Sequence, residues 1–149
     1  MFILRVLTYT HPGRAPPMNL APLLAAPAII QIHAFAAFGA FSLGAVQLAA
    51  PKGTIPHRTF GWTWAGLMLA VVVSSFFIHT IRLWGPFSPI HLLSILTLAL
   101  LPLAVWRARQ HDVRKHQRAM LGLFRGALVV AGVFTFLPGR IMHEVVFGS

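Results

Sequence analysis

Four long apolar runs constrain this chain more than any other feature of its sequence. They extend from about 27 to 50, 60 to 80, 90 to 106 and 119 to 137, and Pro, Gly and basic residues separate them. Their lengths suit helices that cross a bilayer, which need about 17–25 residues. The runs are continuous rather than alternating, which argues against a transmembrane β-barrel. The sequence therefore predicts an all-α membrane protein, a bundle of four transmembrane helices.

The composition supports a membrane protein and excludes several other classes. Hydrophobic residues make up 57% of the 149 residues and charged residues 9%, whereas about a quarter of the residues of a soluble domain are charged. The chain has no cysteine, which excludes disulfides, thiolate metal sites and cysteine-linked haem. Its Lys and Arg form no continuous basic face with interleaved aromatics outside the runs, so nucleic acid is not an expected partner.

The sequence predicts one membrane domain with two short end segments. Residues 20–140 form the predicted transmembrane domain, 1–19 an N-terminal extension and 141–149 a C-terminal tail. The extension has no clear apolar stretch followed by a small-residue cleavage site, so we do not predict a signal peptide. A basic loop from Arg107 to Arg118 is expected between the third and fourth runs.

The basic residues predict an orientation in the membrane. Seven follow the first or third run: Lys52, Arg58, Arg107, Arg109, Arg114, Lys115 and Arg118. Four lie on the other side: Arg5, Arg14, Arg82 and Arg140. The positive-inside rule therefore places the first group in the cytoplasm and both termini on the outer side. We expect the chain to be a multi-pass protein of the bacterial inner membrane.

The histidines fall into two layers when they are placed by depth. His33 and His91 lie near the outer ends of the first and third runs, and His57 and His116 each lie three residues before the second and fourth runs. At 1.5 Å per residue the layers are roughly 20–30 Å apart. Two imidazoles on facing helices are suitable axial ligands for haem iron. The pattern predicts an outer haem b on His33 and His91 and an inner one on His57 and His116.

Other interpretations of these histidines stay open. A histidine at the end of a span also suits the membrane interface and needs no ligand. His79, at the end of the second run, is an alternative outer ligand, and His33, His79 and His91 together make a zinc site conceivable. Arg58 and Arg118, beside the inner pair, are candidate partners for haem propionates.

Two further features concern aromatic and charged residues. Arg125 lies inside the fourth run although no run contains an acid. It must therefore snorkel, bind backbone carbonyls, or meet an anion such as a haem propionate, a lipid phosphate or a neighbouring subunit's carboxylate. Chemistry that needs paired carboxylates, a Ser–His–acid triad or a phosphate-binding glycine loop finds no support in the sequence.

By position, the four tryptophans are predicted to be interfacial belt residues: Trp62, Trp64, Trp84 and Trp106.

Two stretches resemble the signatures of one bacterial membrane family. His57-Arg58-x-x-Gly61 before an apolar run is similar to the His-Arg-x-x-Gly signature of the family called domain of unknown function 2306. A basic stretch leading into His116-x-x-x-Met120 resembles the second signature of that family. The resemblance implies the membrane topology and assigns no activity.

The resemblance covers about residues 20–140 and includes some departures. His33 matches a histidine expected in the first span. Ala119 stands where family members often carry a bulky aromatic, and Trp62 and Trp64 stand where Tyr is usual.

Two functions from different classes follow as hypotheses. The first is a b-type haem protein that transfers electrons in the membrane, to or from quinone, as a carrier or oxidoreductase. The alternative is a non-catalytic accessory subunit of a larger respiratory or photosynthetic complex. The expected partners are the lipid bilayer with quinone in the first case, and a larger complex or a second copy in the other.

Overall fold

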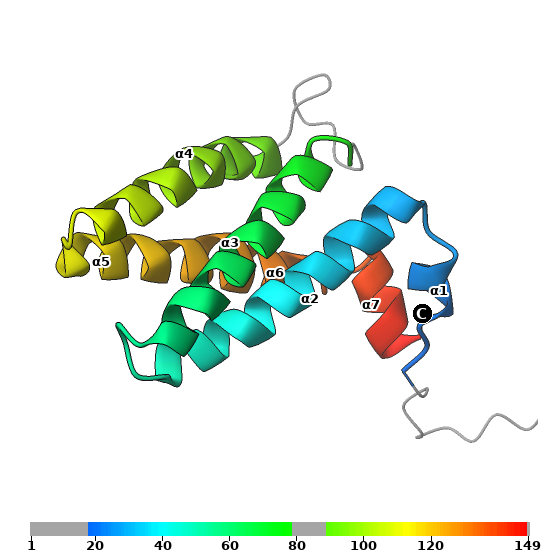
Figure 1. Ribbon diagram of the computed structural model, residues 1–149. Helices are drawn as coiled ribbons and strands as arrows, with labels where there is room; N and C mark the ends of the chain where they lie inside the picture. Colours follow the sequence, from blue (N-terminus) through cyan, green and yellow to red (C-terminus); the bar gives the residue numbers. More distant parts are fainter. Residues whose placement is uncertain (1–17, 79–88, 149) are drawn as a thin grey trace, which may run out of the picture.

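The computed structural model describes residues 18–78 and 89–148, and all regular structure in these ranges is helical (Figure 1). The elements in chain order are α1 (Ala21–Leu24), α2 (Ala28–Ala49), α3 (Ile55–Ser75), α4 (Pro89–Arg109), α5 (Val113–Leu123), the π-helix η1 (Phe124–Val130), α6 (Ala131–Phe134) and α7 (Ile141–Phe147). The last turn of α5 continues directly into η1 and α6, so these three form one long helical stretch.

Three helical stretches are long and apolar enough to cross a membrane. They are Ala28–Ala49, Ile90–Arg109 and Val113–Phe134, which correspond to the first, third and fourth apolar runs. The prediction of an all-α chain is thus confirmed for the described residues. Helix α3 covers most of the second run but is not among these candidate spans. A fourth crossing and the membrane side of the termini therefore stay predictions.

Local signals explain where α3 begins. Gly53 adopts a left-handed φ of 80° in the turn after α2, which suits a residue without a Cβ. Thr54 then caps the helix, because its side chain accepts a hydrogen bond of 3.3 Å from the backbone N–H of His57. Pro56 occupies the first turn, where its missing N–H costs nothing. These residues fix His57 in the first turn of α3.

The basic segment between the third and fourth runs is helical at both ends, which corrects the expected loop. Only Gln110 to Asp112 separate α4 from α5. His111 has a left-handed φ of 57°, and the backbone N–H of Asp112 bonds to the carbonyl of Arg107 at 3.0 Å, a Schellman ending. Asp112 then caps α5 by accepting from the Lys115 N–H at 3.2 Å. Arg, Lys and Gln are good helix formers, so charge alone did not make this segment a loop.

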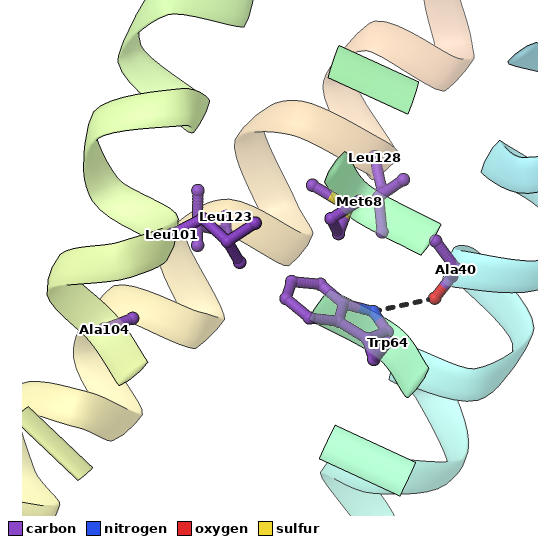
Figure 2. Packing of buried hydrophobic residues seen from close by; sticks show 7 residues of the cluster. All are labelled: Ala40, Trp64, Met68, Leu101, Ala104, Leu123 and Leu128. Carbon is purple, nitrogen blue, oxygen red and sulfur yellow. Dashed lines mark hydrogen bonds between the residues drawn. The ribbon is translucent and has the colours of Figure 1, made fainter. Parts of the chain in front are cut away.

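Helix α3 packs against both α2 and α4 with one face (Figure 1), while Trp62, Leu69 and Val73 on its other face are exposed. Helix α4 packs in turn against α5, and η1 contacts α2 and α4. The core cluster comes from α2, α3, α4, α5 and η1 (Figure 2): Ala40, Trp64, Met68, Leu101, Ala104, Leu123 and Leu128. Large apolar side chains on the outer faces stay exposed, as expected for helices that face lipid: Phe35, Phe38, Leu92, Ile95, Val133 and Phe134.

Trp64 belongs to this core, which corrects its prediction as an interfacial residue. Its side chain is 2% exposed, and its indole N–H donates to the carbonyl oxygen of Ala40 at 2.9 Å (Figure 2). Gly44 makes room for it, because a Cβ there would lie 2.7 Å from Trp64 Nε1. The small residues Ala36, Ala40 and Gly44 are buried, so this ridge of α2 serves close helix packing. Trp62 is 58% exposed, as an interfacial residue would be.

The two ends of the described chain meet. Helix α7 packs on α1, and the backbone N–H of Asn19 donates to the carbonyl of Val145 at 2.9 Å (Figure 1). Val145 is 2% exposed. The C-terminal segment thus ends in a docked helix, and the two ends of the described chain lie together at one end of the bundle.

Candidate functional site

His57 and His116 lie near each other at the end of the bundle where α3 and α5 begin. Both side chains are half-buried. Burial lowers the pKa of His57, which lies before the apolar run that begins at about Phe60, and the charges of His116 and Lys52 lower this pKa further. This effect indicates that the two histidines of the predicted inner layer lie at the same end of the bundle. Their role as ligands stays a prediction.

One ring nitrogen of His116 has a fixed partner. Nδ1 lies 2.9 Å from the backbone carbonyl oxygen of Ala104 in α4. A carbonyl oxygen only accepts, so Nδ1 carries the proton and the neutral ring has its lone pair on Nε2. Metal-binding histidines commonly have this arrangement, because the Nδ1–H bond orients the ring and raises the basicity of Nε2.

Two buried polar atoms, one in the ring of His57 and one in the side chain of Gln47, have no hydrogen-bond partner among the described residues. They are His57 Nδ1 and the side-chain oxygen of Gln47. The amide nitrogen of Gln47 donates to the His57 carbonyl at 2.8 Å, so the α2 side chain lies against the start of α3. An unpaired buried polar atom costs about 1–3 kcal/mol. The sequence analysis did not predict Gln47 as a residue of the site. A single amide side chain near the end of an apolar run is the signal that could have identified it.

His33 contacts the C-terminal part of α3, and His91 contacts Phe76, the residue that caps its C-terminus. His33 Nδ1 lies 3.1 Å from the carbonyl oxygen of Val71 and 2.9 Å from Ser74 Oγ. The Ser74 hydroxyl itself lies 2.7 Å from the Ala70 carbonyl. His91, on α4, is 4% exposed and its ring centroid lies 6.1 Å from that of Phe76. The structure thus places both outer histidines at the C-terminal end of α3.

Serines extend the polar contacts at this level of the bundle. Ser75 Oγ of α3 and Ser94 Oγ of α4 are 2.6 Å apart, and both side chains are buried. Neither serine was predicted to matter, because a serine in an apolar run gives no signal of the helix it faces. His79, the alternative outer ligand, lies outside the described residues, and so does the zinc site that would include it. Within residues 18–78 and 89–148, no group of three or more His, Cys, Asp or Glu side chains can hold a metal ion.

The cationic residues near the inner pair are exposed. Arg58 follows His57 on α3, Arg118 lies two residues after His116 on α5, and both side chains face outward. Arg125 is exposed as well, one residue into the π-helix. All three can reach an anion that lies outside the packed core.

A family comparison covers this whole arrangement. The model of the family described as "Predicted membrane protein (DUF2306)" matches residues 30–147, which is more than half of the chain. The chain belongs to this family. In this DUF2306 protein the match extends from α2 to α7 and includes His33, His57, His91 and His116. No curated protein and no solved structure matches the chain.

Proposed function

We propose that this DUF2306 protein is a membrane-embedded electron-transfer protein that binds haem b between His57 and His116. The observation that supports this most strongly is the Ala104 carbonyl on His116 Nδ1, which directs the Nε2 lone pair of that histidine away from α4. The second support is His57, a nearby imidazole with a buried nitrogen that lacks a hydrogen-bond partner among the described residues.

The residues around the pair fit a flat ring with two carboxylates. Gly61 lies one turn after His57 and Ala119 nearly one turn after His116, so small side chains follow both ligands. Trp64 and Leu123, which belong to the packed core (Figure 2), follow one turn later. The proposed site therefore lies beside the core, near the first turns of α3 and α5. When bound, haem supplies a centre that accepts and donates one electron.

The protein's own residues perform three tasks in this proposal. Ala104 orients His116, and the buried position of His57 favours its neutral form, which is the form that ligates iron. Arg58 and Arg118 provide cations for the propionates at the membrane surface. His33 has a comparable Nδ1 contact with the Val71 carbonyl, so its pairing with His91 around an outer haem is a second, separate proposal.

We also infer that α3 is a fourth crossing, although it is less apolar than the three candidate spans. One face of α3 packs against α2 and α4, where its buried Ser74 and Ser75 lie within hydrogen-bond distance of His33 and Ser94. Polar groups that are paired inside the bundle add little to the cost of a crossing, and the exposed Leu69 and Val73 on the other face of α3 suit contact with lipid. Four crossings put both chain ends on the same side, consistent with the bond between Asn19 and Val145.

An absorption spectrum tests the haem proposal. We expect protein that was produced with ample haem and purified in mild detergent to show a Soret band and the reduced bands of haem b. His57→Ala and His116→Ala should each lose most of this absorbance per chain. His143→Ala is the matched control, because His143 lies in α7, where its Nδ1 contacts the Phe136 carbonyl at 2.8 Å.

Two results would contradict the proposal. One is a colourless wild-type protein under haem-replete conditions. If the colourless protein also co-purified with a larger complex, the accessory-subunit hypothesis would replace the haem proposal. The other is an equal loss of colour in all three variants. Gel filtration shows whether each variant is folded. His116→Met keeps an iron ligand, so it should keep the haem with a changed reduction potential, which distinguishes ligand loss from unfolding.

A further inference from the structure

An open hollow of about 270 Å³ lies on the exposed side of α5 and shares only Arg118 with the proposed haem site. It is lined by Arg114, Gln117, Arg118 and Leu121. These positions recur at intervals of three and four residues, so they share one face of the helix. Two guanidinium groups and an amide thus surround the hollow, with a leucine at the end nearest the apolar run.

The two arginines of the hollow have no acidic partner in the part of the chain that the structure describes. The sequence contains only two acids, Asp112 and Glu144. The Asp112 carboxylate already forms ion pairs, with Lys115 Nζ at 3.0 Å and Arg107 Nη1 at 3.9 Å. Glu144 lies in α7, at the end of the bundle where the two ends of the described chain meet. With a formal net charge of +10, the chain must obtain further counter-charge from outside.

The position of the hollow along the helix indicates where that anion comes from. Arg114 is the second residue of the candidate span Val113–Phe134, and Leu121 is the ninth. At 1.5 Å per residue the lining covers about 10 Å, comparable with the depth of a lipid headgroup region. Arginine matches the oxygens of a phosphate in pairs, and leucine suits the first carbons of an acyl chain.

We propose that this hollow binds the phosphate of an anionic phospholipid. The proposal also provides an anion near Arg125, which is exposed four residues beyond Leu121 on the same helical stretch. A cation that faces lipid without a protein carboxylate is costly, and a headgroup drawn inward at the hollow reduces that cost.

Native mass spectrometry of the delipidated, purified chain tests this proposal. The probes are phosphatidylglycerol, phosphatidylcholine and inorganic phosphate. We expect retention of phosphatidylglycerol in preference to phosphatidylcholine, and the pair Arg114→Ala and Arg118→Ala should weaken it by about tenfold. The control pair is Lys52→Ala and Arg109→Ala, which removes the same charge from the same end of the bundle, outside the hollow; it should change retention less than about twofold.

Two further measurements distinguish a lipid site from general charge attraction and from a free-phosphate site. The pair Arg114→Lys and Arg118→Lys keeps the charge but loses the paired geometry of the guanidinium groups, so we expect intermediate retention of phosphatidylglycerol. This variant also tests the site if the alanine pair fails to fold. Equal loss in the alanine and control pairs would overturn the proposal in favour of general charge attraction. Full displacement of the lipid by millimolar inorganic phosphate would overturn it in favour of a free-phosphate site.

Discussion

The indole N–H of Trp64 donates a 2.9 Å hydrogen bond to the backbone carbonyl oxygen of Ala40. This bond joins α3 to α2 inside the core, where Trp64 is 2% exposed and Ala40 is fully buried. His57 lies two turns before Trp64 on the same face of α3. The hydrogen bond between Trp64 and Ala40 therefore also helps to position His57 along α3 and on the face of α3 that packs in the bundle.

Trp64→Phe removes this hydrogen bond and keeps an aromatic ring in the core. We expect it to lower the free energy of unfolding by about 1 kcal/mol, a typical value for one buried hydrogen bond. The matched control is Trp62→Phe, because Trp62 is 58% exposed. Reversible unfolding in mixed micelles measures both changes, and equal effects of the two substitutions would contradict the role assigned to Trp64.

Gly44→Ala should disturb the packing of α2 against its neighbours. The new Cβ would lie 2.7 Å from both Phe124 Cδ2 and Trp64 Nε1, and overpacking of a core costs about 1–3 kcal/mol. Gly66→Ala is the control, because a Cβ at that helical position meets nothing within 4 Å. It should stabilise the chain by up to about 1 kcal/mol. The same unfolding assay would refute this interpretation if Gly44→Ala were neutral.

Asp112 should titrate below its usual range. Hydrogen bonds from the side chain and backbone of Lys115 lower its pKa from the ordinary value of 3.8, and nearby charges add to this effect. The ionised carboxylate therefore stabilises the fold above about pH 4, and this contribution is lost as the pH falls through the lowered pKa. Lys115→Met should move the pKa back upward, whereas Lys52→Met should not.

Carboxyl carbon NMR measures this titration directly, because the chain has only two acidic side chains. An Asp112 midpoint that stays unchanged in Lys115→Met would show that the ion pair and cap do not lower the pKa.

The absence of cysteine makes the four-crossing topology simple to test. Single cysteines at the exposed positions Met18 and Phe147 should react with a membrane-impermeant maleimide from one side. Those at Lys52 and Gln110, which lie in the turns after α2 and α4, should react from the other side. Labelling of Met18→Cys and Phe147→Cys from opposite sides would mean an odd number of crossings and would exclude α3 as a fourth span.

Much of the helical architecture could be predicted from the sequence, because apolar runs directly reflect contact with lipid. The runs located α2 and α4 closely, whereas the fourth run was predicted to begin at about residue 119, inside the stretch from Val113 to Phe134. The prediction of a loop at Arg107–Arg118 was wrong because basic residues also form helices. The helical ends of this segment depend on the cap at Asp112 and on a turn that closes at His111.

The candidate site was predictable in its layers but not in its hydrogen bonds. The levels of His57 and His116 follow from the ends of the apolar runs, which the sequence shows. The partner of His116 is Ala104, twelve residues away, and that of Trp64 is Ala40, 24 residues away. Alanine carbonyls carry no sequence signal, so contacts of this kind depend on how the helices pack.

The central claim is that His57 and His116 ligate one haem iron. Low-temperature electron paramagnetic resonance of the oxidised protein tests it most directly, because two imidazole ligands give a low-spin ferric signal. We predict one such signal per chain, lost in His57→Ala and in His116→Ala, where any haem that remains is high-spin, and unchanged in His143→Ala. A low-spin signal that persists in both ligand variants, or no ferric haem signal in haem-replete protein, would contradict the claim.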